Sequence, residues 1–224
     1  MNIDLTTVRF GIGAHDATDA PTGDRDMCIM EAVSFIAGEP WSDTPACASP
    51  VIAAFLRGWN DALSDADRDH LLPAAVWVPR LVGSRGTSDV EERRSYLALD
   101  WLVRVYASAW LDLVPSLQPH AAALRALPEI VDITTAKSAG CVVHAALAAA
   151  WDATGNAAWD AAWDAARAAA WDAAWDAARA AAGDATRGAA GDALRPTVET
   201  LQQSALDLLD RMLACGEHRR EEEK

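Results

Sequence analysis

The chain has 224 residues, of which 51% are hydrophobic and 23% are charged, and its net charge at pH 7 is −14. This length supports a sizeable core in one large or two small domains, and the apolar content excludes a disordered chain. The acidity disfavours direct binding to a nucleic-acid backbone and favours basic partners. We find no apolar run near the roughly 20 residues that span a bilayer. We find no secretory signal either, so we expect a cytoplasmic protein that does not bind membranes.

The N-terminal third is predicted to be a mixture of loops and one helix. A short strand is expected at Thr7–Ile12, followed by a loop rich in turn-forming residues at His15–Asp26. The apolar spacing of Met27–Ala37 predicts a helix, and Gly38 is the residue type that ends one. Three prolines in Glu39–Pro50 indicate a second loop.

Two further helices are indicated by their capping residues. Ser49 is a typical N-cap and Pro50 suits the first turn that follows it. Ser64 or Asp65 is expected to cap the next helix, which Pro79 should interrupt.

A long helix is predicted from Ser88 to Val114, since acidic residues favour its first turn and Pro115 follows its end. Its apolar residues Leu102, Trp110 and Leu111 are expected to face the core. A shorter helix is expected at about His120–Leu127.

The C-terminal part is rich in alanine, the strongest helix former. It predicts helix from about Ala139 to Leu194, with an interruption at Gly155–Asn156. Pro196 should break the register before a last helix at Val198–Cys215. The predicted fold is therefore mainly α. Its domains are an N-terminal helical domain at residues 1–135, Ala-rich helices with a closing helix at 136–216, and a frayed tail at 217–224.

A four-residue repeat runs from Trp151 to Arg195, and its block Ala157–Ala168 recurs unchanged at Ala169–Ala180. Four residues advance a helix by slightly more than one turn, so successive tetrads drift by roughly 40° around it. The repeat is best interpreted as a packing device. Exposed tryptophans would instead form a docking surface, because tryptophan is common at binding hot spots. The candidates are Trp159, Trp163, Trp171 and Trp175.

Cysteine and histidine residues in the N-terminal part suggest two alternative sites. A metal set would comprise His15, Cys28, Cys47 and His70, but its spacing matches no zinc finger. A catalytic cluster would comprise His15, Cys28 and Glu31, because Glu31 lies one helical turn after Cys28. We expect reduced cysteines, no bound metal and no cofactor.

Acidic residues are concentrated near the N-terminus, where residues 1–70 hold twelve acidic and four basic side chains. Their loop could ligate calcium, but it lacks the EF-hand spacing, and a solvated loop is favoured. As a surface, it is a candidate contact for a basic partner. The acidic loop residues are Asp16, Asp19, Asp24 and Asp26.

The block MCIMEAVSFIAGEPWSDTPACASPVIAAFLRGWND, which spans Met27–Asp61, carries a family resemblance together with Pro79–Gly83 (PRLVG) and Leu206–Glu217 (LDLLDRMLACGE). With the Ala-rich tract, these segments resemble an uncharacterised family of actinobacterial and phage-encoded proteins. The resemblance implies no activity and supplies no catalytic residues.

We therefore expect a non-enzymatic helical interaction module, of phage or bacterial-conflict origin, that binds and masks a protein partner. One alternative is a metal-dependent or cysteine-based enzyme centred on the N-terminal cluster. The other is a self-associating structural oligomer.

Overall fold

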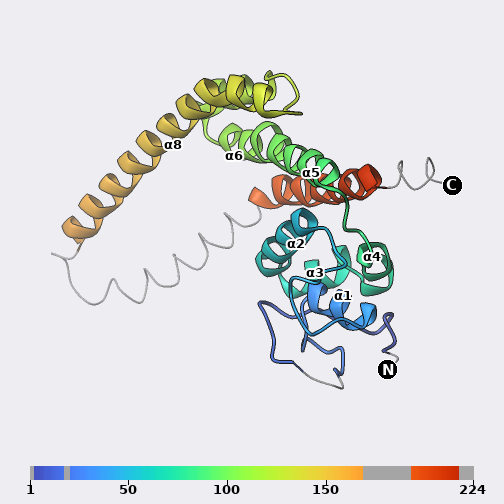
Figure 1. The fold of residues 1–224 in the computed structure, drawn as a ribbon. Coiled ribbons are helices and arrows are strands. Elements are labelled where there is room, and N and C mark those ends of the chain that lie inside the picture. The colour runs from blue at the N-terminus through green and yellow to red at the C-terminus, as the bar shows by residue number, and fades with distance from the viewer. Residues whose placement is uncertain (1–2, 18–20, 169–192, 217–224) are drawn as a thin grey trace. The chain divides into compact units, whose positions relative to one another are not determined.

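The computed structural model describes residues 3–17, 21–168 and 193–216, with side chains for all of these except 154–168. The described chain is mainly helical, which confirms the predicted fold class (Figure 1). The strand expected at Thr7–Ile12 is wrong: these residues form one isolated bridge, between Arg9 and Asp24. The pairing ends there because the next donor, the amide of Gly11, bonds the carbonyl of Met27 instead, at 2.8 Å.

The chain divides into two compact units. Unit 1 comprises Met1–Leu99 and Ala205–Lys224, and unit 2 comprises Asp100–Ser204. These limits differ from the predicted division at residue 135, because the C-terminal segment belongs with the N-terminal helices. The predicted tail, 217–224, lies outside the described residues.

Unit 1 contains α1 (Ile29–Ala37), α2 (Pro50–Ala62), α3 (Asp65–Leu71), α4 (Ala74–Leu81) and most of α5 (Ser88–Asp100). The predicted caps are confirmed. Ser49 accepts a hydrogen bond from the amide of Ile52, and Ser64 accepts one from the amide of Asp67. Gly38 ends α1 with a φ of 69°, a left-handed conformation that glycine adopts without steric cost.

The predicted break at Pro79 is wrong, and the chain breaks at Pro73 instead. Pro73 is the N-cap of α4, whereas Pro79 lies inside that helix. Pro79 removes the amide that would bond the carbonyl of Ala75. Both residues are exposed, so water can satisfy that carbonyl.

The core of unit 1 includes the last part of a helix that spans residues 193–216. This helix passes through Pro196, so the predicted break there is wrong. Its side chains Leu208, Leu209 and Met212 are buried, as are Met30 and Leu56 from α1 and α2.

A buried arginine fixes the end of this last helix within unit 1. Arg94 of α5 donates to the carbonyls of Met212 and Ser84, each at 2.8 Å, and pairs with Glu91 at 2.7 Å. A Cβ atom on Gly216 would lie 2.7 Å from Nη2 of Arg94, so any other residue at this position would require the guanidinium to shift. Arg94 thus joins the last helix to α5 and to the segment before it, although Met212 lies 118 residues further along the chain.

Unit 2 begins with a helix in which the hydrogen-bonding pattern changes. After α5, a π-helix, η1 (Trp101–Ala107), leads into α6 (Ser108–Asp112). The sequence predicts one helix here but not the π segment. The hydroxyl of Ser108 donates to the carbonyls of Arg104 and Val105, at 2.6 and 3.1 Å, where the π segment ends.

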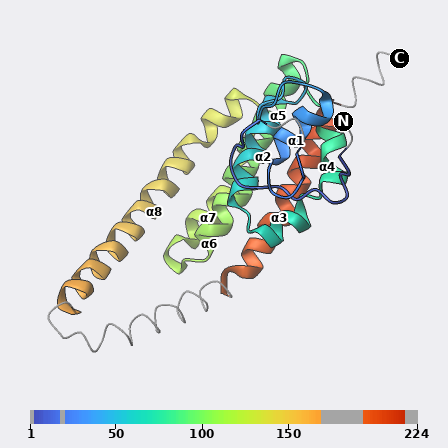
Figure 2. The ribbon, with the colours of Figure 1, turned by 90° about the horizontal axis from the view of Figure 1, so that it is seen from below.

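The remaining elements of unit 2 are η2 (Pro115–Leu117), α7 (Gln118–Arg125) and α8 (Ile133–Ala168). The interruption predicted at Gly155–Asn156 is wrong, since α8 is continuous there. Helix α8 runs beside α7 and diverges from it toward its C-terminal end (Figures 1 and 2). By length and composition alone, Ile133–Ala153 of α8 is apolar enough to cross a membrane, so the prediction that no run of this length exists is wrong.

We predict that Arg94→Met lowers the free energy of unfolding by about 3 kcal/mol, since it leaves Glu91 and two carbonyls without their buried partner. Urea unfolding followed by circular dichroism measures this change. Arg80→Met is the control, because Arg80 makes an exposed ion pair with Asp210 that is worth about 1 kcal/mol or less. Equal losses in the two variants would contradict the structural role of Arg94.

Candidate functional site

The structure brings together the three residues of the predicted catalytic cluster. Glu31 is 1% exposed, and its carboxylate accepts hydrogen bonds from the amide of Cys28 at 2.7 Å and from the amide of His15 at 2.7 Å. It also contacts Nδ1 of His15 at 2.8 Å. Cys28 and Glu31 occupy the N-cap and N3 positions of α1, which is the arrangement of a capping box.

The bonds of this cluster hold the N-terminal loop against α1. Both carboxylate oxygens of Glu31 are occupied, and the carbonyl of His15 accepts from the indole of Trp41 at 3.0 Å. Burial raises the pKa of the Cys28 thiol to about 12, so it stays protonated near neutral pH. Because the thiolate is the nucleophile, this cysteine is poorly suited to covalent catalysis.

The other members of the predicted metal set are placed separately in the fold. Cys47 lies in the loop before α2, where its carbonyl accepts from the amide of Arg85, and His70 is exposed on α3. In the described part of the chain, no three histidine, cysteine or acidic side chains are grouped so as to hold a metal ion. None of the four cysteines forms a disulfide.

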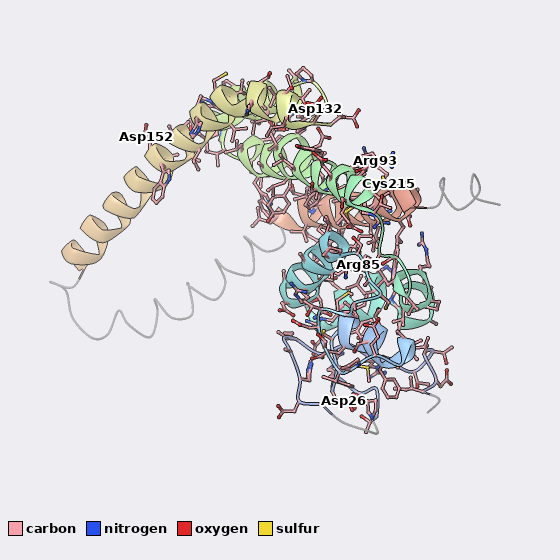
Figure 3. The ribbon with its side chains drawn as sticks, viewed as in Figure 1. Asp26, Arg85, Arg93, Asp132, Asp152 and Cys215 are labelled. Carbon is pink, nitrogen blue, oxygen red and sulfur yellow. The ribbon has the colours of Figure 1, made fainter. Side chains whose placement is uncertain are left out.

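One residue of the acidic loop, Asp26, has a structural role. Asp26 accepts from the amides of Thr22 and Gly23, at 2.6 and 3.0 Å (Figure 3). Partial burial alone would raise the pKa of Asp26, but these hydrogen bonds hold it below its ordinary value. Asp16 and Asp24 are exposed, whereas Asp19 lies outside the described residues.

The most distinctive surface feature is an apolar groove in unit 2. It has a volume of about 410 Å³ and lies between the η1–α6 segment and α8, with a contribution from α7. Its walls are aliphatic and aromatic, and they expose no polar atom to the groove. The lining residues are Leu102, Val103, Tyr106, Ala107, Trp110, Leu111, Leu124, Val143, Ala146, Leu147 and Ala150.

The π-helix shapes one wall of the groove. A π-helix closes its hydrogen bonds from i to i+5, so its turn is wider than that of an α-helix. Residues spaced by four and five positions therefore share a face. The rings of Trp101 and Tyr106 lie 5.3 Å apart, and those of Tyr106 and Trp110 lie 6.2 Å apart. Such segments are frequent at functional sites.

The helix that forms this wall carries unpaired buried donors. Nε of Arg104 and Nε1 of Trp110 have no hydrogen-bond partner in the described structure. Each unpaired donor costs about 1–3 kcal/mol, and such groups are rare in native proteins. The wall is therefore less stable than an ordinary helix of the same composition.

Large apolar side chains of the groove and its rim are open to solvent. Leu102 is 49% exposed and Leu147 is 55% exposed. Trp151, which begins the tetrad repeat, is 70% exposed and lies one residue beyond the groove on α8. Contiguous exposed apolar patches are common at interaction sites.

The prediction that Leu102 faces the core is wrong, because Leu102 lines the open groove and is 49% exposed. The apolar spacing was visible, but the spacing alone does not tell whether a neighbouring helix covers that face. The predicted binding tryptophans lie outside the description: Trp159 and Trp163 are on the α8 backbone without described side chains, and Trp171 and Trp175 lie outside the described residues altogether.

Comparison with protein-family models, with curated protein sequences and with solved structures finds no match to this chain. The resemblance to actinobacterial and phage proteins therefore stays a prediction. The geometry of the chain itself has to carry the functional argument.

We predict that Cys28 reacts with iodoacetamide at least tenfold more slowly than Cys141, because Cys28 is buried with a raised pKa and Cys141 is exposed. Variants that each retain one cysteine, with serine at the other three positions, allow mass spectrometry to follow each thiol. Raising the pH from about 7 to 9 should leave Cys28 slow, since its pKa stays well above that range. Rapid labelling of Cys28 at pH 7 would instead restore it as a candidate nucleophile.

Proposed function

We propose that this protein is a non-enzymatic interaction module whose unit 2 groove binds the apolar face of a basic amphipathic helix from a protein partner. The observation that carries the proposal is the open, wholly apolar groove beside Leu102 and Leu147. Binding there would cover the partner's apolar face and so mask it from other proteins.

The lining of the groove favours a helix over a small molecule. Small-molecule sites place a few polar groups among apolar walls to orient the ligand. This groove presents no polar atom, so it offers burial without orientation. An amphipathic helix needs only an apolar surface to bind. Its apolar side chains at i, i+3, i+4 and i+7 insert into the groove, and its polar face stays in water.

Charge favours a basic partner over a second copy of the chain. With a net charge of −14, two copies repel each other at long range. Exposed carboxylates of unit 2, such as that of Asp152 on α8, add to this negative charge (Figure 3). A helix with lysine or arginine beside its apolar face would be attracted to this surface, and the attraction would weaken with salt.

A designed peptide tests the groove. The probe is a fluorescent amphipathic helix of about 15 residues, or roughly four turns, with leucines on one face and lysines on the other. We predict that a Leu102→Asp, Leu147→Asp double variant weakens its binding at least tenfold, because burial of a leucine side chain contributes about 1.5–3 kcal/mol. Fluorescence anisotropy gives the dissociation constants.

Two controls separate groove binding from charge attraction alone. Val76→Asp adds a negative charge at an exposed apolar position of unit 1 and should leave the affinity unchanged or slightly higher. A peptide with serine in place of leucine should lose binding to the unaltered chain. Equal affinity of the double variant and the unaltered chain, or a groove already occupied in a stable dimer, would overturn the proposal.

A further inference from the structure

A second pocket lies in unit 1 and differs in chemistry from the groove. Its volume is about 280 Å³, and two arginines, Arg57 of α2 and Arg85 of the segment between α4 and α5, line it together with Thr44. Apolar side chains, including Pro45 and Pro50, form the rest of its wall. Two guanidinium groups in one small pocket are notable in so acidic a chain.

Both arginines are hydrogen-bonded to the loop that precedes α2. Nη1 of Arg57 donates to the carbonyl of Asp43 at 3.1 Å, and Nη1 of Arg85 donates to the carbonyl of Ala46 at 3.0 Å. A guanidinium carries five N–H donors, so each group keeps donors beyond these contacts. The loop therefore sets both side chains in place without using up their hydrogen-bonding capacity.

The positive charge of the pocket is only partly neutralised. Nε of Arg57 lies 3.6 Å from the carboxylate of Asp43, which is longer than a hydrogen bond. Among the described side chains, no carboxylate lies within ion-pair distance of Arg85. The buried arginines Arg68 and Arg94, by contrast, each have a carboxylate at 2.7 Å.

The start of α2 adds to this positive charge. Pro50 and Ala53, in the first turn of this 13-residue helix, line the same pocket. The N-terminus of a helix carries a partial positive charge from its aligned peptide dipoles. Arginine forks match the oxygens of a phosphate group in paired hydrogen bonds.

We propose that this pocket binds the phosphate group of a small anionic ligand, of the phosphate monoester class, between Arg57 and Arg85. Arg57 and Arg85 carry two positive charges, and Asp43 pairs with Arg57 alone, which favours a dianion over a monoanion. The pocket's volume restricts the ligand to a small molecule, whose organic part would contact Pro45 and Pro50. This site is independent of the groove and of its proposed partner.

Titration of the full chain with inorganic phosphate tests the site. Nuclear magnetic resonance at constant ionic strength follows the backbone amides of Val51 and Ala53, which should shift and saturate. Arg85→Gln should weaken the affinity about tenfold or more, since a hydrogen bond to a charged group is worth about 1.5–3 kcal/mol. Arg85→Lys keeps the charge but loses the paired N–H donors of the guanidinium. Its affinity for phosphate should therefore lie between those of the unaltered chain and of Arg85→Gln.

The control is Arg80→Gln, which removes an exposed arginine that does not line the pocket and should leave the affinity unchanged. Thermal unfolding of each variant shows that the fold is retained. If the arginines only fix the loop at Asp43–Ala46, the amides will shift linearly without saturation, or all variants will bind phosphate equally. Either outcome would overturn the proposal.

Discussion

The arrangement of unit 2 depends on the carboxylate of Asp100. This buried side chain accepts a hydrogen bond from the amide of Ile130 at 2.8 Å and from Nη1 of Arg104 at 3.0 Å. Helix α8 begins three residues after Ile130, and η1 begins immediately after Asp100. One carboxylate therefore fixes the start of both helices that form the groove. Without it, the buried amide of Ile130 would lose its partner, and α8 would lose its position beside η1.

The groove lies where unit 2 leaves apolar side chains of η1, α6 and α8 uncovered. In the η1–α6 segment, the buried donors of Arg104 and Trp110 have no partner in the described structure, and Leu102 is 49% exposed. Unpaired buried donors and exposed apolar surface both cost stability, and contiguous exposed apolar patches are common at interaction sites.

The sequence predicts those parts of the fold that depend on local chemistry. Ser49, Ser64 and Gly38 act within one turn of their helices, so their residue types were sufficient. The hydrogen bond from Arg94 to the carbonyl of Met212 joins residues far apart in the chain, and no local sequence pattern predicts it. Whether a side chain is exposed also depends on residues far away in the sequence, so it could not be predicted either. The cluster of Cys28 and Glu31 was predictable from their spacing, but the burial that raises the pKa of the thiol was not.

If the groove binds a helix, the groove would control the affinity for that helix, and the charge of the chain would control which helices bind. An apolar groove binds any apolar helix of suitable shape, so its lining cannot choose among partners. The charge of the whole chain can choose, because it attracts basic helices and repels acidic ones before contact is made. On α8 an exposed tryptophan and an exposed aspartate, Trp151 and Asp152, follow directly after the last groove residue, Ala150. The sequence repeats this tryptophan–aspartate pair along α8, and its period of four turns successive pairs by roughly 40° around the helix.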